Sequence, residues 1–176
     1  MRAIIAGCLY LFLAAPAMAQ TALKPALAPL GFLVGSWDSG EGKVADTGGT
    51  SKGGSTFTVE SDGTAILRRD HTELFGKDGK PAGGFHQTML IYAEDGKLKA
   101  DYVDGEGHAI HYTGTAVTAG KSVTFMGITQ ADAHGPTFKL RYEMKGPDTL
   151  AVSFGMTAPG GSEFRPVANG TLKRAR

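Results

Sequence analysis

The sequence has little that would cross-link, anchor or strongly charge a protein. Its 176 residues include a single cysteine, Cys8, so the chain cannot form an intramolecular disulfide. The formal net charge of +1 excludes the basic excess expected of a protein that binds nucleic acid. Beyond residue 20, no apolar run reaches the roughly 18 residues that a membrane-spanning helix needs. With 41% hydrophobic residues, the chain is suited to one globular domain with its own core.

Residues 1–19 have the features of a cleavable export signal. A positive charge precedes an apolar run, and Ala17-Met18-Ala19 supplies the small residues of a cleavage site. We predict cleavage before Gln20, which removes Cys8 and directs the mature protein to the periplasm or the medium. Ile5-Ala6-Gly7-Cys8 is similar to a lipidation motif. Only four residues precede it, too few for an apolar region, so the sequence does not favour a lipoprotein.

Residues 20–176 show the two-residue alternation of β-strands. Phe138, Leu140 and Tyr142, for example, alternate with charged residues. Turn pairs such as Asp62-Gly63 and Asp95-Gly96 separate such runs. Together these patterns predict about ten strands, at 36–45, 54–61, 64–74, 85–93, 97–103, 108–117, 122–130, 137–145, 149–157 and 162–174.

Ten sequential strands joined by hairpins predict an all-β fold, a single antiparallel up-and-down barrel. Pro25 and Pro29 limit the preceding segment to a short helical turn, which we expect to close one end. The glycine-rich residues 45–54, including Gly53-Gly54, are expected to form a loop. A two-sheet sandwich is the alternative architecture.

The segment Phe32-Leu33-Val34-Gly35-Ser36-Trp37 resembles the opening of lipocalins and related calycin barrels. It is also similar to nitrobindin-like proteins and to an uncharacterised family of exported bacterial single-domain barrels. Gly35 would let the chain turn into the barrel, and Trp37 offers a flat surface to plug its end. The resemblance implies that an arginine of the last strand, Arg174, packs over the indole in a cation–π contact.

Nitrobindin-like proteins bind heme through a histidine near the end of the final strands. Residues 164–176 contain no histidine, so we expect no cofactor, although another histidine such as His71, His86 or His111 remains an alternative axial ligand.

The other groups of charged residues and histidines are explained by ordinary strand surfaces. Asp70, His71 and Glu73 are close in sequence, with Arg69 on the face of His71, but a solvated row of charges is the simpler interpretation. His108 and His111 have an odd spacing, which sends them to opposite strand faces. We assign no catalytic residue and no metal site.

The barrel interior is the remaining candidate site. The residues predicted to line it and to contact a ligand are Arg69, Met89, Ile91, Tyr102, Tyr112, Phe125, Phe138, Tyr142 and Phe154. Arg68 and Arg69 are adjacent, so one must point inward, where a guanidinium needs an anionic partner. The alternation alone does not decide which one; the predicted lining includes Arg69.

These features predict an exported barrel, monomeric or homodimeric, that binds a small hydrophobic or amphipathic molecule. The sequence leaves two alternatives open. One is a heme protein or enzyme that uses a cavity histidine, and the other is a filled structural barrel without a ligand.

Overall fold

The computed structural model describes residues 21–43, 47–129 and 135–175. The predicted export signal, Cys8 and His134 lie outside these ranges. Ten strands follow a short 3₁₀ helix: η1 Ala28–Leu33, β1 Gly35–Lys43, β2 Thr50–Glu60, η2 Ser61–Gly63, β3 Ala65–Phe75, β4 Pro81–Glu94, β5 Lys97–Asp104, β6 Ala109–Thr118, β7 Ser122–Ile128, β8 Thr137–Gly146, β9 Thr149–Met156 and β10 Arg165–Arg174.

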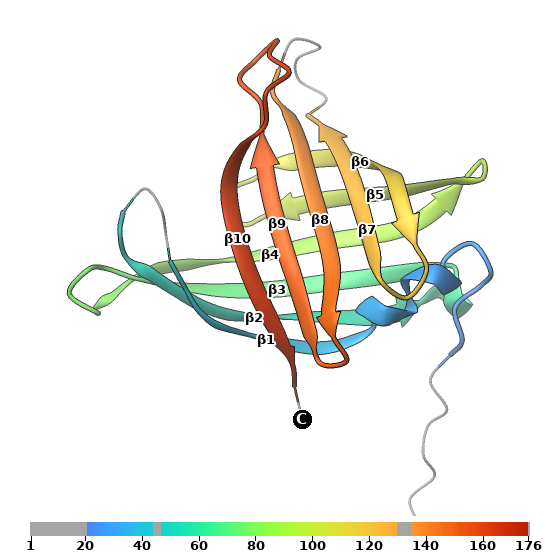
Figure 1. Cartoon of the computed structure of the whole chain (residues 1–176), viewed down its shortest axis with the longest axis horizontal. Helices are drawn as coiled ribbons and strands as arrows, with labels where there is room; N and C mark the ends of the chain where they lie inside the picture. The colour runs from blue at the N-terminus through green and yellow to red at the C-terminus, as the bar shows by residue number, and fades with distance from the viewer. Residues whose placement is uncertain (1–20, 44–46, 130–134, 176) are drawn as a thin grey trace, which may run out of the picture.

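The strands form one closed barrel in which each strand pairs with its neighbours in the chain. All pairs are antiparallel, and β1 closes the barrel against β10 through the pairing of Trp37 with Arg174. In Figure 1, β7 to β10 pass in front of β1 to β4. The predicted all-β barrel of ten strands is therefore confirmed. Because the sheet closes on itself, the two-sheet sandwich is excluded.

The predicted N-terminal helical turn is η1, and it closes one end of the barrel. Leu27, Leu30 and Leu33 are buried in the hydrophobic core. Backbone hydrogen bonds fix the segment to two turns: Lys24 N–H donates to Gly63 O at 2.9 Å, and Gly120 N–H donates to Pro29 O at 2.9 Å. The end with the β2–β3 and β6–β7 turns is thus the closed end. We call the opposite end, where the β3–β4 and β5–β6 loops lie, the mouth.

Trp37 and Arg174 complete this closure. The Trp37 indole is buried and donates a hydrogen bond to Leu33 O at 2.7 Å. The Arg174 guanidinium lies 4.2 Å from the centroid of the indole ring, the contact implied by the resemblance. Gly35 has a φ of +123°, and a Cβ there would lie 2.8 Å from Arg174 Nη1. Both the backbone conformation and the close approach therefore favour glycine.

The prediction that Gly53-Gly54 belongs to a loop was wrong. Both glycines lie inside β2 and pair with residues of β1 and β3. A Cβ on Gly53 would lie 2.0 Å from the backbone oxygen of His71. Glycine here allows two strands to approach closely, which is a structural role inside a strand rather than a signal of a loop.

Candidate ligand-binding site in the barrel interior

The two halves of the barrel differ in how tightly their interior is packed. Inward-facing side chains near η1, including Ile66, Ile91 and Leu150, are fully buried. Toward the mouth, the inward-facing Tyr102, Phe138, Val152 and Phe154 are only partly buried. The closed half is therefore a packed core, whereas the other half keeps part of its lining open to solvent.

β3 carries the central residue of the site, and it is Arg68 rather than Arg69. Arg68 is 8% exposed and pairs with the inward-facing Met89 of β4. Arg69 is exposed and points outward. The inclusion of Arg69 in the lining was therefore wrong. The physical reason is the pleat of β3, which places Ile66, Arg68 and Asp70 on one face.

Arg68 has an anionic partner inside the barrel. Its Nη2 donates to Asp70 Oδ2, and the two side chains form an ion pair whose members are 10% and 6% exposed. Nη2 also donates to Gln87 Oε1 at 3.3 Å, and Nη1 lies 3.8 Å from the Met89 sulfur. The guanidinium carbon lies 5.7 Å from the centroid of the Tyr142 ring. A buried charge thus has both a counter-charge and an aromatic face.

Among the described residues, three polar atoms of this cluster are buried and have no hydrogen-bond partner. They are Arg68 Nε, Asp70 Oδ1 and the Tyr142 hydroxyl oxygen. A buried polar group without a partner destabilises a fold by about 1–3 kcal/mol, and such groups are uncommon in folded proteins. One donor, one acceptor and one hydroxyl therefore remain to be satisfied in one place.

A chain of hydrogen bonds links this cluster to the mouth. Gln87 Nε2 donates to the Tyr102 hydroxyl at 2.9 Å, and that hydroxyl donates to Asp104 Oδ2 at 3.3 Å. His108 Nδ1 lies 3.0 Å from the same carboxylate oxygen, and the His108 side chain is 64% exposed. The network therefore runs from the buried Arg68 to solvent across β3, β4 and β5.

The ionisation of the network follows from burial and from these bonds. Burial and then the charge of Asp104 raise the pKa of Tyr102 to about 12. Burial also raises the pKa of Tyr142 well above its ordinary value, with Arg68 opposing the shift. For Asp104, partial burial opposes ionisation, but hydrogen bonds from the His108 backbone and side chain and from the Glu106 backbone lower the pKa. The tyrosines are consequently neutral donors at neutral pH, and Asp104 is a carboxylate.

The apolar part of the lining is largely aromatic. The Phe138 and Phe154 rings stack at 5.9 Å with an interplanar angle of 2°. Tyr112 and Phe125 meet edge to face at 6.2 Å. Both pairs belong to the predicted lining, as do Met89, Tyr102 and Tyr142 around Arg68. Ile91 lies deeper, in the packed half. The lining thus combines flat apolar surface with a polar cluster.

None of the four described histidines points into the interior. His71 and His86 are exposed and face each other across β3 and β4 on the outer surface. His111 faces outward and lies 2.6 Å from Asp101 Oδ1. His108 lies in the β5–β6 loop at the mouth. Within residues 21–43, 47–129 and 135–175, no histidine is therefore placed to bind a heme iron from the wall of the barrel.

Neither a metal cluster nor a membrane helix is found in the described part of the chain. No three His, Asp or Glu side chains there are grouped to hold a metal ion. No helix there combines the length and hydropathy that crossing a bilayer requires.

Asp70 is buried inside the barrel, whereas His71 and Glu73 are exposed on the outer surface, so these three sequence neighbours do not share one face.

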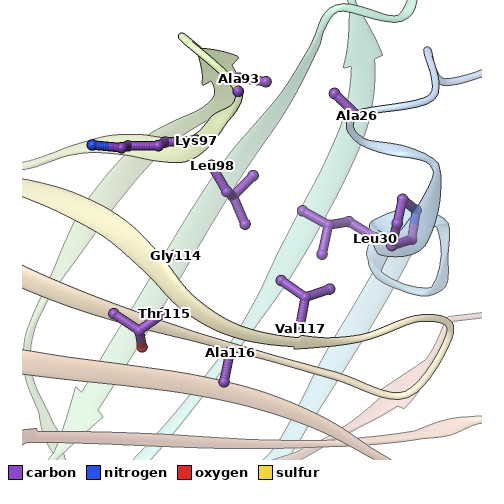
Figure 2. A pocket seen from close by; sticks show the side chains of 11 residues that line it. Ala26, Leu30, Ala93, Lys97, Leu98, Gly114, Thr115, Ala116 and Val117 are labelled. Atoms are coloured by element: carbon purple, nitrogen blue, oxygen red, sulfur yellow. The ribbon is translucent and has the colours of Figure 1, made fainter.

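A hollow lies at the closed end, between η1 and the β4–β6 strands (Figure 2). Its volume is about 420 Å³, and its lining is mostly apolar, with Leu30, Leu98 and Val117 around Gly114. Lys97 supplies the only charged side chain of the lining, and its amine points away from the labelled apolar groups in Figure 2. Thr115 is the other polar side chain of the lining, and its hydroxyl already donates to Thr124 O at 3.4 Å, so the hollow offers few free polar groups to orient a ligand.

Sequence reasoning missed Asp70 and Gln87 as members of the interior site. A signal for both exists: Asp70 follows Arg68 by two residues, and Gln87 precedes Met89 by two. Each pair shares a strand face. Grouping Asp70 with its sequence neighbours hid this relationship.

Comparison with known proteins supports the fold. No protein-family model matches the sequence, and no curated protein matches it. Rv2717c from M. tuberculosis has a similar structure, with a TM-score of 0.62 and 21% identity, covering 88% of this chain and 99% of that chain. At this identity, the likeness shows a shared fold alone.

A second solved structure, EF1p2_mFAP2b bound to DFHBI, covers 84% of this chain and 98% of its own. Its TM-score is 0.36 and its identity is 14%, too low to support any argument about this barrel.

Proposed function

We propose that this protein is an exported carrier or receptor that holds one small amphipathic molecule in the mouth half of its barrel. The guest, as we call this molecule, would direct its polar end to Arg68, Asp70 and Tyr142. Its apolar body would pack against Phe138 and Phe154. Export remains inferred from residues 1–19, whose pattern is that of a signal.

The observation that carries this proposal is the group of three unpartnered polar atoms inside the barrel. A purely structural interior would be more stable with apolar side chains in place of a buried ion pair. These atoms are buried, so a guest would have to displace a neighbouring side chain to reach them. A guest that offers hydrogen bonds would then satisfy them and pack against the aromatic part of the lining. The partly exposed side chains toward the mouth support access from that end.

The proposal can be tested by fluorescence titration of the purified protein with N-phenyl-1-naphthylamine, a neutral probe that emits strongly in apolar surroundings. We expect saturable binding of one probe per chain. Ala168 pairs with Phe154 and so faces the interior, whereas its neighbour Asn169 faces outward. Ala168→Trp should fill the space beside Phe154 and weaken binding at least about tenfold. Asn169→Trp is the matched control and should bind as the wild type does.

Two results would contradict the proposed function, and they can be told apart. A wild-type protein without saturable binding, which also carries no extra mass in native mass spectrometry, would favour the filled structural barrel and overturn the proposal. Equal effects of the two tryptophan substitutions would place the probe outside the barrel. Val152→Trp, also inward-facing, repeats the test if Ala168→Trp does not fold.

A further inference from the structure

The positive charge of Arg68 is already balanced before any guest arrives. The hydrogen-bonded network contains one fixed cation, Arg68, and two carboxylates, Asp70 and Asp104. Asp70 neutralises the guanidinium directly. His108 lies beside the outer carboxylate, but its ring is largely exposed at the mouth. The inner end of the network therefore offers no uncompensated positive charge to an anionic guest.

The unpartnered atoms have complementary hydrogen-bonding character. Arg68 Nε can only donate, Asp70 Oδ1 can only accept, and the Tyr142 hydroxyl can do either. A carboxylate has acceptors alone, so it would leave Asp70 Oδ1 unsatisfied. A group with a donor beside an acceptor can satisfy both kinds of atom.

A side chain of the protein already shows which group fits beside Arg68. The Gln87 carboxamide accepts from Arg68 Nη2 at 3.3 Å and donates to the Tyr102 hydroxyl at 2.9 Å. Its carbonyl accepts a hydrogen bond from one residue while its NH₂ donates one to another, so a neutral donor–acceptor group fits this position. The bond to Arg68 is long, so a better-placed guest group could displace it at small cost.

We propose that the barrel selects guests whose polar end is a neutral donor–acceptor group, such as a carboxamide or lactam, over the corresponding carboxylates. This inference rests on the proposed function, because it names the chemistry of the guest in the same interior site. A carboxylate would lose its hydration and approach Asp70 without gaining a free cation. A carboxamide loses less hydration and offers an acceptor to Arg68 Nε and a donor to Asp70 Oδ1.

The test compares 2-naphthamide with 2-naphthoate, two guests of nearly equal size and shape. Their affinities for the full-length wild-type protein are measured at neutral pH by isothermal titration calorimetry and by displacement of the neutral probe. We expect the amide to bind at least about tenfold more tightly than the carboxylate. N,N-dimethyl-2-naphthamide keeps the carbonyl but lacks the donor, and we expect it to lose most of this advantage.

A charge substitution should change the preference. Asp70→Asn keeps an acceptor for Arg68 but leaves the guanidinium uncompensated, so the amide-to-carboxylate ratio should fall at least about tenfold. Asp101→Asn is the control, because Asp101 lies on β5 but bonds His111 and Tyr92 on the outer surface. It should leave the ratio unchanged.

The outcomes separate this inference from the proposed function. If the wild type binds neither naphthyl compound nor the neutral probe, the proposed function fails. If it binds 2-naphthoate as tightly as 2-naphthamide, the barrel is a carrier but the inferred selectivity is wrong. An unchanged ratio in a folded Asp70→Asn variant would overturn the inference as well. If that variant does not fold, the three wild-type affinities still decide the question.

Discussion

Arg68 and Asp70 lie two residues apart on β3 and form an ion pair inside the barrel, while Arg69 between them is exposed. The pleat of the strand produces this arrangement, because residues i and i+2 share a face. The pair lies in the wall of the barrel at the boundary between the packed half and the open half. Ser55, which is also buried, pairs with Asp70 on the neighbouring strand, so the pair is part of a polar patch within the mostly apolar core.

Removing the guanidinium should destabilise the fold. Arg68→Met leaves the Asp70 carboxylate buried without its counter-charge, and we expect the free energy of unfolding to fall by about 3–5 kcal/mol. Arg69→Met is the adjacent control and should change stability by no more than about 0.5 kcal/mol. Urea unfolding followed by circular dichroism measures both. Similar losses in the two variants would contradict the assignment of Arg68 to the interior.

Replacing both members of the pair should separate stability from binding. In Arg68→Met/Asp70→Leu, no charge of the pair remains buried, so most of the stability lost in Arg68→Met should return. The same variant lacks the donor and the acceptor for a guest, so it should lose the preference for 2-naphthamide. Recovery of stability with an unchanged preference would show that the pair does not contact the guest.

The strand order could be predicted from the sequence because local signals agree with the fold. Alternation sets each strand, and pairs such as Asp95-Gly96 set the turns; Asp95 and Gly96 indeed both have positive φ. Strands joined by consecutive hairpins pair with their neighbours in the chain, which gives a meander. The predicted and observed boundaries of β5, β7, β8 and β9 accordingly agree within two residues at each end.

The inward arginine could not be predicted in this way. Ile66 and Leu67 are both apolar, so the alternation before Arg68 fits either register. The pairing of Arg68 with Met89 decides it, and that pairing is a long-range property of the barrel. The Gln87–Tyr102 hydrogen bond also could not be predicted, because it joins two strands and depends on how they pair. Gly53 is a further case, because its close contact with β3 exists only after the strands pair.

Closure by Trp37 and Arg174 can be followed through fluorescence, since the chain has a single tryptophan. Arg174→Gln removes the cation over the indole and weakens the hydrogen bonds to Val34 O and Phe32 O. We expect a red-shifted Trp37 emission and a loss of about 2 kcal/mol of stability. Lys173→Gln, on the neighbouring residue, should change neither, because the bond from Lys173 Nζ to Thr149 is exposed. An unshifted emission in Arg174→Gln would contradict the proposed closure.

Substitution by alanine should lower the stability of the fold at Gly53 but not at Gly170. Gly53→Ala would place a Cβ 2.0 Å from the His71 backbone oxygen, so β2 and β3 must separate. We expect a loss of about 1–3 kcal/mol in thermal or urea unfolding. Gly170→Ala meets open space, and we expect it to be neutral or to stabilise by about 0.5 kcal/mol through reduced freedom of the unfolded chain. A neutral Gly53→Ala would show that the glycine is not required for strand approach.

Alkaline pH should destabilise the barrel through its tyrosines. The pKa is raised above the ordinary value near 10 for each of the four described tyrosines, Tyr92, Tyr102, Tyr112 and Tyr142. The folded state therefore holds these protons more tightly than the unfolded chain, and their contribution to stability is complete below about pH 10. It is lost as pH rises, and for Tyr102 the loss extends to its folded pKa of about 12.

In a spectrophotometric titration, we expect the phenolate absorbance to appear together with the loss of circular dichroism. We also expect Tyr102→Phe to make the decline of stability above pH 10 less steep. Phenolate formation at about pH 10 in a fully folded protein would contradict the burial of this network.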